Sequence, residues 1–367
     1  MKKPSILITS VGSRAAEGIL ACLAPVRDRI RVIATNSVAD APGLYDADVA
    51  YLVPPTAHEV AFAQRMTEIA GLEAPDLVVN GRDEEVVMLA HLFAHEPLDQ
   101  PVFLGPRPGL APIFNDKYQT AAFAREHGLP FVATAFAEAE VRLLLATSGL
   151  PVVAKPRAGG HASRDVYVLT TPEQVEAALQ HGGFVFQAFV GEGRLGDSFR
   201  SWNTRLGIPW MWNPPQLVPH AGCGHRSQWR GGGGMCVEGR ARRQRGAAPA
   251  TARHARSACA GASPCAGSGR GGAPWAVNIQ GVVLPDGSFV AFEWNARFVG
   301  STPGYALLGQ NQVVAALRHF LPALSDLPDP ASSRATVFRP LVFRGVPNDA
   351  IELLRENGQW QLEARVR

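Results

Sequence analysis

Short apolar segments alternate with helix-like segments through the first third of the chain, and this alternation constrains the fold most. The strand-like segments span residues 5–11, 31–36 and 76–80. Because parallel strands need a crossover that is usually a helix, the alternation predicts a parallel α/β sheet. Ligands of such sheets bind beyond the carboxyl ends of the strands, which are marked here by Gly12, Asn36 and Asp83.

The loop after the first predicted strand does not have the pattern of a dinucleotide-binding loop. Residues 11–18 read VGSRAAEG, which lacks the GxGxxG spacing, and no acidic residue closes the second strand. A nicotinamide-dependent dehydrogenase is therefore disfavoured.

A β-hairpin is predicted near the carboxyl end of the chain. Two apolar runs, residues 277–284 and 289–292, flank the turn sequence Pro-Asp-Gly-Ser. Strand side chains alternate between the two faces of a sheet, so the sequence also predicts which side chains after the second run lie together.

Three polar residues at alternate positions end this second strand. Glu293, Asn295 and Arg297 are predicted to point to one side, where a carboxylate, an amide oxygen and a guanidinium suit Mg²⁺ and phosphate oxygens. Gln280, on the first strand, could add another oxygen. The alternative is a surface strand with an ion pair between Glu293 and Arg297.

The middle of the chain carries features that suit a nucleotide. Lys155 ends an apolar strand and directly precedes a glycine-bearing loop, residues 157–164, of a kind that can fold its N–H groups around phosphates. A solvated surface lysine is the alternative. A further apolar strand, residues 184–190, ends at Gly-Glu-Gly and could hold a flat heterocycle through its backbone.

Composition indicates a soluble globular protein that we expect to be cytoplasmic. The 367 residues are 46% hydrophobic, which is ample for cores of two or three domains. No window approaches the roughly 18 uncharged apolar residues of a membrane span, and the first residues do not resemble a signal peptide.

The positive charge of the chain is concentrated in one stretch. Residues 221–273 hold nine Arg and one acidic residue, and the rest of the chain has 26 basic and 31 acidic residues. The basic balance therefore gives no reason to expect nucleic-acid binding by the whole protein.

The order of these features resembles the ATP-grasp superfamily, and within it the carbamoyl-phosphate-synthase-like carboxylate–amine ligases. The likeness covers about residues 1–195 and 274–325. It implies a Rossmann-like pre-ATP-grasp domain with a parallel sheet, followed by a two-subdomain ATP-grasp fold of α+β type. The implied divisions are 1–110 for the first domain, 111–185 for the small subdomain, 186–325 for the large subdomain and 326–367 for a short carboxyl-terminal piece.

The resemblance also implies a role for particular residues. Those expected to bind ATP are Lys117, Lys155, Gly159, Gly160, Ser163, Gln187, Phe189 and Val190. Those expected to bind Mg²⁺, with Mn²⁺ as an alternative, are Gln280, Glu293 and Asn295. Arg297 and Lys155 are implied as catalytic residues, with Arg297 in contact with phosphate or the acyl phosphate.

The reaction that the resemblance implies activates a carboxylate as an acyl phosphate and joins it to an amine. Phosphoryl transfer asks the protein mainly for positioning and charge neutralisation, so cations and a metal suffice without a protein nucleophile. The expected partners are a small-molecule carboxylate and an amine, with no nucleic acid and no membrane, and a homodimer is left open.

Residues 194–273 depart from this pattern. Between residues 221 and 273 there is no Ile, Leu, Phe, Tyr, Lys or Asp, there is one Val, and four of the chain's five cysteines occur there. Such a composition cannot bury a core, and the cysteine spacings do not fit a zinc site. We therefore expect this stretch to pack poorly and to lack the strands of the family.

A compensated frameshift explains the stretch. Trp210-Met211-Trp212 can be encoded only by TGG-ATG-TGG, and the frame that begins a base earlier permits Tyr-Thr-Val-Asp-Val across residues 208–212, a strand sequence often found in such ligases. The alternative to a frameshift is a genuine Arg/Gly-rich disordered insert that could bind RNA or acidic partners. The alternative to the ligase function is an ATP-binding or scaffold protein that has lost catalysis because this stretch is altered.

Resequencing of the gene tests the frameshift hypothesis directly. It is expected to reveal a base gained or lost near each end of residues 194–273, with strand-like alternation restored between them. An unchanged reading of the DNA, together with protection of this stretch from hydrogen exchange, would favour a real insert.

Overall fold

The computed structural model describes residues 3–93, 101–159, 165–190, 221–224, 235–238, 276–284, 288–327, 337 and 344–362. The chain forms two compact units. The first comprises Met1–Ala111, Ala273–Val277 and Ala296–Arg367, and the second comprises Pro112–Gly272 and Asn278–Asn295.

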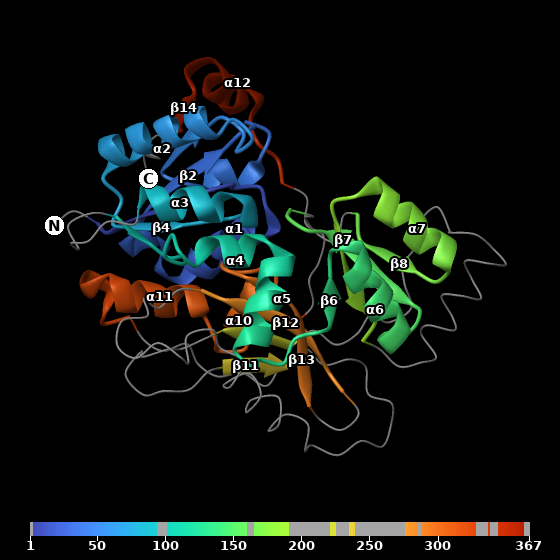
Figure 1. The fold of residues 1–367 in the computed structure, drawn as a ribbon. Coiled ribbons are helices and arrows are strands. Elements are labelled where there is room, and N and C mark those ends of the chain that lie inside the picture. The colour runs from blue at the N-terminus through green and yellow to red at the C-terminus, as the bar shows by residue number, and fades with distance from the viewer. Residues whose placement is uncertain are drawn as a thin grey trace. The chain divides into compact units, whose positions relative to one another are not determined.

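The first unit contains the predicted parallel sheet, in the order β14-β3-β2-β1-β4-β5 (Figure 1). Its strands are β1 (Ser5–Ile8), β2 (Arg31–Asn36), β3 (Val49–Leu52), β4 (Leu77–Val79), β5 (Val102–Phe103) and β14 (Gln359–Gln361). All neighbouring pairs are parallel except β14 with β3. The α/β prediction for this part of the chain is therefore confirmed.

Helices connect and cover these strands. In the first unit, the described α-helices are α1 (Arg14–Leu23), α2 (Glu59–Glu73), α3 (Val86–Leu92), α10 (Thr302–Leu307), α11 (Gln312–Phe320) and α12 (Asn348–Asn357). Short 3₁₀ helices are η1 (Ala24–Arg29), η2 (Pro42–Asp46), η3 (Asp83–Glu85) and η5 (Pro322–Leu324). α1 begins at Arg14 because the hydroxyl of Ser13 caps it by accepting from the Ala16 N–H.

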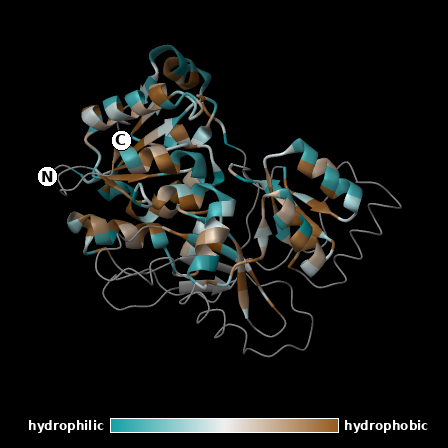
Figure 2. Ribbon diagram, in the orientation of Figure 1, coloured by the Kyte–Doolittle hydropathy of each residue, from teal (hydrophilic) through white to brown (hydrophobic). Residues whose placement is uncertain are grey.

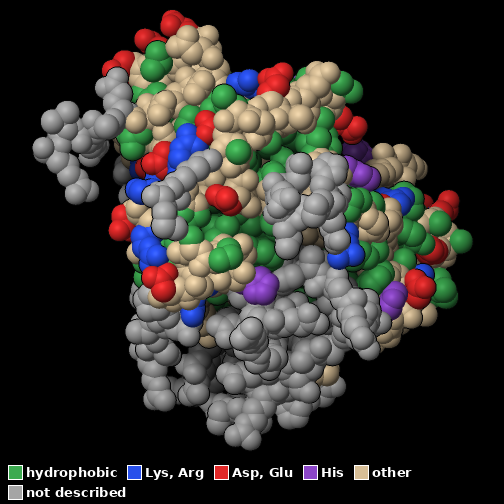
Figure 3. Space-filling model, turned by 90° about the vertical axis from the view of Figure 1, so that its left-hand side faces the viewer, with side chains coloured by type: hydrophobic (Ala, Val, Ile, Leu, Met, Phe, Trp, Pro, Cys, Tyr) green, Lys and Arg blue, Asp and Glu red, His purple; other side chains and the backbone are tan. Residues whose placement is uncertain are grey.

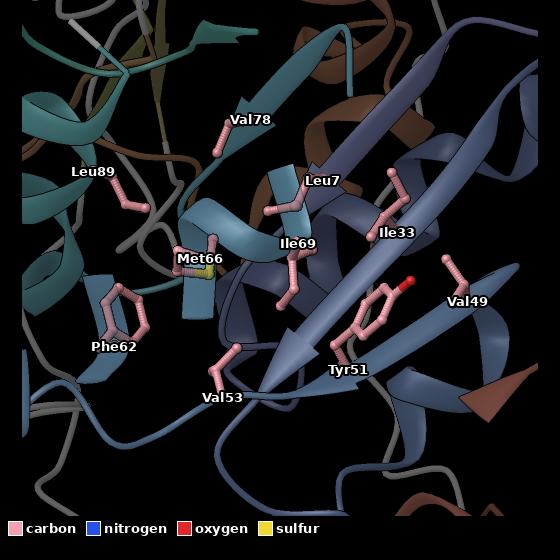
Figure 4. Packing of buried hydrophobic residues seen from close by; sticks show 10 residues of the cluster. All are labelled: Leu7, Ile33, Val49, Tyr51, Val53, Phe62, Met66, Ile69, Val78 and Leu89. Atoms are coloured by element: carbon pink, nitrogen blue, oxygen red, sulfur yellow. The ribbon is translucent and has the colours of Figure 1, made fainter. Parts of the chain in front are cut away.

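The core of the first unit lies between the sheet and α2 with α3 (Figure 4). It consists of Leu7, Ile33, Val49, Tyr51, Val53, Phe62, Met66, Ile69, Val78 and Leu89. All four residues of β1 are buried, as expected for a parallel strand that is covered on both faces. Figure 2 shows these strands as apolar and the outer sides of the helices as polar.

The carboxyl-terminal residues belong to the first unit. β14 pairs with β3 in antiparallel register, with Trp360 opposite Ala50. The indole of Trp360 also packs edge-on against Tyr45, with ring centroids 5.3 Å apart. The piece beyond residue 326 therefore completes the edge of the first sheet.

The second unit contains a smaller sheet in the order β6-β9-β7-β8. Its elements are β6 (Thr134–Ala135), α6 (Glu138–Ser148), β7 (Val152–Pro156), β8 (Tyr167–Leu169), α7 (Pro172–His181) and β9 (Phe184–Ala188). One face buries alternate residues of β7 and β9 against α6 and α7, including Ala154 and Phe186. The opposite face therefore carries Lys155 and Gln187.

The other sheet of the second unit has the order β11-β10-β12-β13. Its strands are β10 (Ala221–Gly224), β11 (Met235–Glu238), β12 (Asn278–Val283) and β13 (Phe289–Asn295), and this part of the unit also contains α4 (Ala111–Asn115) and α5 (Lys117–Glu126). β12 and β13 form the predicted antiparallel hairpin. Trp294 of β13 is 2% exposed and packs against Phe114, Phe123 and Phe131.

One expectation for residues 194–273 is wrong in part. β10 and β11 lie within this stretch and pair with each other, and Cys223 of β10 also pairs with Ile279 of β12. Strand pairing uses backbone hydrogen bonds, so it does not require the apolar side chains that the stretch lacks. The other residues of the stretch, including Trp210-Met211-Trp212, lie outside the described residues.

Charges of opposite sign are interspersed on the described surface seen in Figure 3. Exposed ion pairs of the first unit include Arg29 with Asp326, at 2.9 Å. Among the described helices, none has the length and apolar character needed to cross a membrane.

Candidate functional site

The register of the hairpin places four polar side chains on one face. Gln280 lies directly opposite Glu293, and Asn278 lies directly opposite Asn295. Directly opposite residues of an antiparallel pair point to the same side. The predicted ligands Gln280, Glu293 and Asn295 are thus brought together, and Asn278 joins them.

Asn278 was missed by the sequence reasoning, although the alternation of Asn278 with Gln280 was the signal that could have found it. Its side-chain oxygen Oδ1 is buried and has no hydrogen-bond partner among the described residues. An unpartnered buried carbonyl oxygen is costly unless a donor or a cation occupies its vicinity. The carboxylate of Glu293 with the amide oxygens of its neighbours is a donor set that fits Mg²⁺.

A β-bulge interrupts the hairpin at this face. Gln280 pairs with Glu293 but Gly281 pairs with Ala291, so Phe292 is the extra residue on β13. The carbonyl oxygen of Phe292 accepts hydrogen bonds from Lys155 Nζ at 2.9 Å and from Gln187 Nε2 at 3.2 Å. The bulge therefore joins the two sheets of the second unit beside the proposed metal ligands.

Lys155 is buried, and its ammonium group is largely desolvated. Its Nζ lies 4.0 Å from Glu293 Oε2, and the residue is 4% exposed, so it is not a solvated surface lysine. Burial lowers the pKa of Lys155 from 10.5 to about 8; the nearby Glu293 opposes this shift and Lys117 adds to it. An ammonium with little solvation is well suited to bind an anion.

Lys117 lies at the start of α5 and reaches the glycine-bearing loop. Asp116 caps α5 through Oδ1, and its Oδ2 accepts from Arg157 Nε at 2.7 Å. Lys117 Nζ donates to the carbonyl of Gly159 at 2.8 Å. These contacts hold Lys117 against the beginning of the loop, while Gly160 and Ser163 lie outside the described residues.

The predicted adenine-binding segment begins in β9 and continues past its end. Gln187 is 3% exposed, and its amide also donates to Thr134 Oγ1 at 3.1 Å. Phe189 and Val190 follow the strand and are half-buried. The site residues on β7, β9 and β13 thus lie close together around the Phe292 carbonyl. Their roles in binding a nucleotide remain predictions.

Arg297 lies beyond the end of β13 and belongs to the first unit. Its Nη2 donates to Asp83 Oδ2 at 2.6 Å, and its Nε is buried without a hydrogen-bond partner among the described atoms. The structure therefore shows an ion pair with Asp83 and not the alternative pair with Glu293. Asp83 follows β4, at the edge of the parallel sheet where ligands are expected.

A buried carboxylate, Glu85, lies at the same edge and was also missed. Its two oxygens accept hydrogen bonds from the hydroxyls of Thr9 and Ser10, each at 2.6 Å. Burial raises the pKa of Glu85, although both hydroxyls oppose the shift. The sequence signal was weak, because Glu85 stands in a run of charged residues that is typical of an exposed turn.

Replacing Glu85 by Gln is expected to change the pH dependence of stability. Burial raises the pKa of Glu85 above 4.5, so the folded state binds its proton more tightly than the unfolded chain does. The resulting stability is fully present below the unfolded pKa and is lost as pH rises through the folded pKa. The Tm of wild type relative to Glu85→Gln should therefore fall in thermal melts as pH rises above 4.5, the ordinary pKa of the group. A pH-independent difference would contradict this.

Comparisons with known proteins identify the fold. Models of protein families give no match, and neither do curated protein sequences. Among solved structures, N5-carboxyaminoimidazole ribonucleotide synthetase from Thermotoga maritima superposes with a TM-score of 0.58 at 17% identity, covering 90% of this chain and 78% of its own. The Aspergillus clavatus N5-carboxyaminoimidazole synthase, in complex with ADP and 5-aminoimidazole ribonucleotide, has a TM-score of 0.57 at 13% identity, covering 91% and 80%.

A third similar structure comes from a carboxylase. It is the biotin carboxylase domain of the Hydrogenobacter thermophilus 2-oxoglutarate carboxylase, in complex with MgADP, ADP and bicarbonate. It has a TM-score of 0.57 at 14% identity, covering 85% of this chain and 69% of its own. At these identities the likeness concerns the fold. The chain has the ATP-grasp fold with a pre-ATP-grasp domain before it.

Proposed function

We propose that this chain is an ATP- and Mg²⁺-dependent ligase that activates a carboxylate as an acyl phosphate and joins it to an amine. The observation that carries the proposal is the convergence of Lys155 and Gln187 on the bulge carbonyl of Phe292, next to Glu293. A buried cation and a face of oxygen ligands are what a metal-bound nucleotide requires.

The neighbouring structures support this reaction class. The Thermotoga and Aspergillus proteins are named as synthetases or synthases, and the Aspergillus protein was solved with ADP. The Hydrogenobacter domain was solved with MgADP and bicarbonate. We infer from these names that ATP and Mg²⁺ are also used by this chain.

The residues proposed to hold Mg²⁺ are Glu293, Asn295 and Gln280, with the oxygen of Asn278 available beside them. When bound there, Mg²⁺ would neutralise phosphate charge and align the phosphates. Glu293 would also hold the ammonium of Lys155 within reach of the same phosphates.

Lys155 is proposed to bind phosphate oxygens and to stabilise charge during transfer. An ammonium has three N–H donors, so it can bind a phosphate oxygen while one donor stays on the Phe292 carbonyl. Lys117 would approach the phosphates from the glycine-bearing loop. Arg297 would contact phosphate or the acyl phosphate, with its guanidinium oriented by Asp83.

Calorimetry and phosphate release test the proposal together. Wild type is expected to bind ATP in a Mg²⁺-dependent manner and to release phosphate when a mixture of amino acids and other small carboxylates is supplied with amines. Binding without turnover by any mixture would favour the catalytically impaired ATP-binding protein. Absence of Mg²⁺-dependent ATP binding would overturn both.

A further inference from the structure

We infer that Thr134, acting through Gln187, is a positioning residue that sets the bulge of β13 and thereby the spacing of Lys155 and Glu293. The catalytic consequence of this inference rests on the proposed function. The hydrogen bonds that link Thr134 and Gln187 to the Phe292 carbonyl, here called the brace, are a property of the ligand-free chain. None of the predicted site roles involves Thr134, which lies on β6, at the edge of the smaller sheet.

The hydrogen bonds form a continuous chain with fixed directions. Phe292 O can only accept, so the amide atom of Gln187 that faces it must be the nitrogen. The same nitrogen donates to Thr134 Oγ1, and the Thr134 hydroxyl in turn donates to Val132 O at 2.9 Å. The donor and the acceptor of each hydrogen bond are therefore fixed, and the orientation of the Gln187 amide is determined by its partners.

The chain of bonds returns to β13 and closes into a ring. Val132 N donates to Ala291 O at 2.8 Å, and Ala291 N donates to Pro130 O at 2.9 Å. Ala291 precedes Phe292, so the segment from Pro130 to Thr134 holds the residue before the bulge while Gln187 holds the carbonyl of the bulge itself. A bulge held at Ala291 and at the Phe292 carbonyl cannot shift that carbonyl without breaking several hydrogen bonds.

This ring determines where the charged groups lie. Lys155 Nζ is anchored to the carbonyl of Phe292, and the next residue, Glu293, carries the carboxylate 4.0 Å from that ammonium. A rotation of the Phe292 peptide would move both groups relative to Gln280, the residue opposite Glu293. Groups that orient metal ligands typically change metal affinity or activity by about 10- to 100-fold when they are removed.

Gln187 is thereby given a second role beside the predicted adenine contact. Both of its donors are used by Thr134 and Phe292, which leaves its oxygen for an exocyclic amine. A glutamate at this position would keep the acceptor but could not donate to the Phe292 carbonyl. The choice of an amide is explained by the brace and not by adenine alone.

The experiment uses Thr134→Val, which removes the hydroxyl and keeps the shape, with Thr134→Ser as the conservative variant. The matched control is Thr147→Val, because the Thr147 hydroxyl bonds to the Leu143 and Leu144 carbonyls of α6, away from the bulge. Hydrogen exchange of ligand-free protein and the Mg²⁺ concentration for half-maximal ATP binding are measured for each.

Thr134→Val is expected to speed exchange in peptides covering β13 and to raise the half-saturating Mg²⁺ concentration about 10-fold, a larger change than any weakening of ADP binding without Mg²⁺. Thr134→Ser should restore both, and Thr147→Val should alter neither. Unchanged β13 exchange in folded Thr134→Val overturns the brace, whatever the enzyme does. Faster exchange with unchanged Mg²⁺ dependence overturns its positioning role. Faster exchange in a chain whose wild type binds no MgATP supports the brace and instead refutes the proposed function.

Discussion

Replacing Lys155 by Met is expected to weaken ATP binding by about 10- to 150-fold, the equivalent of a charge-assisted hydrogen bond worth about 1.5 to 3 kcal/mol. Met keeps most of the apolar stem and removes the ammonium. Because the side chain is 5% exposed, the nucleotide would lose a cation that water cannot replace well. Isothermal titration with MgATP measures the effect.

The same variant should not lose stability in the absence of nucleotide. Burial lowers the pKa of Lys155 from 10.5 to about 8, so the fold prefers the neutral amine. Stability is therefore highest above the unfolded pKa and is lost as pH falls toward the folded pKa, by about 3 kcal/mol in total. The Tm of Lys155→Met relative to wild type should rise as pH falls from about 10 to about 8 and then stay level.

A matched control for Lys155→Met is Lys3→Met, which makes the same chemical change at an exposed position. It should leave MgATP affinity unchanged. Unaltered affinity in Lys155→Met would contradict the assignment of Lys155 to the phosphates. A large loss of apo stability in that variant would instead indicate a structural role for its bond to Phe292.

Local sequence patterns predicted the elements that carry the site. Alternation by two placed Glu293 and Asn295 on one face, and the hairpin that holds them is present. The apolar run before Lys155 forms β7, and the capping sequence at Thr171 forms α7. These signals are short-range, because strand faces and helix caps depend on neighbouring residues only.

The features that the sequence did not reveal depend on distant contacts. The partner of Arg297 is Asp83, 214 positions away, and the anchor of Lys155 is a backbone carbonyl 137 positions away. No side-chain type encodes the bulge at Phe292, whose carbonyl is held by Lys155 and Gln187, both more than 100 positions away. The edge pairing of Trp360 with Ala50 likewise needed the assembled sheet to be visible.

Replacing Glu293 by Gln is expected to reduce Mg²⁺-dependent ATP binding by at least about 100-fold, more than the loss of an outer-shell group would. Glu293 provides the carboxylate of a face whose other described oxygens come from the amides of Gln280, Asn278 and Asn295. Gln preserves the shape of the side chain and removes its charge. ATP titrations across Mg²⁺ concentrations, with ADP lacking Mg²⁺ as a reference, measure the change.

The ligand-free stability of Glu293→Gln separates a metal ligand from a structural ion pair. Glu293 is 28% exposed and lies 4.0 Å from Lys155, at the outer limit of an ion pair, so losing their attraction should lower the apo Tm only slightly. Glu352→Gln, the same change on an exposed face of α12, should alter neither the apo Tm nor the Mg²⁺ dependence of ATP binding. A large fall in apo Tm with Mg²⁺ dependence retained would assign Glu293 to the neutralisation of Lys155. The expected result, a small fall in Tm with Mg²⁺ dependence lost, would identify the hairpin face as the metal site.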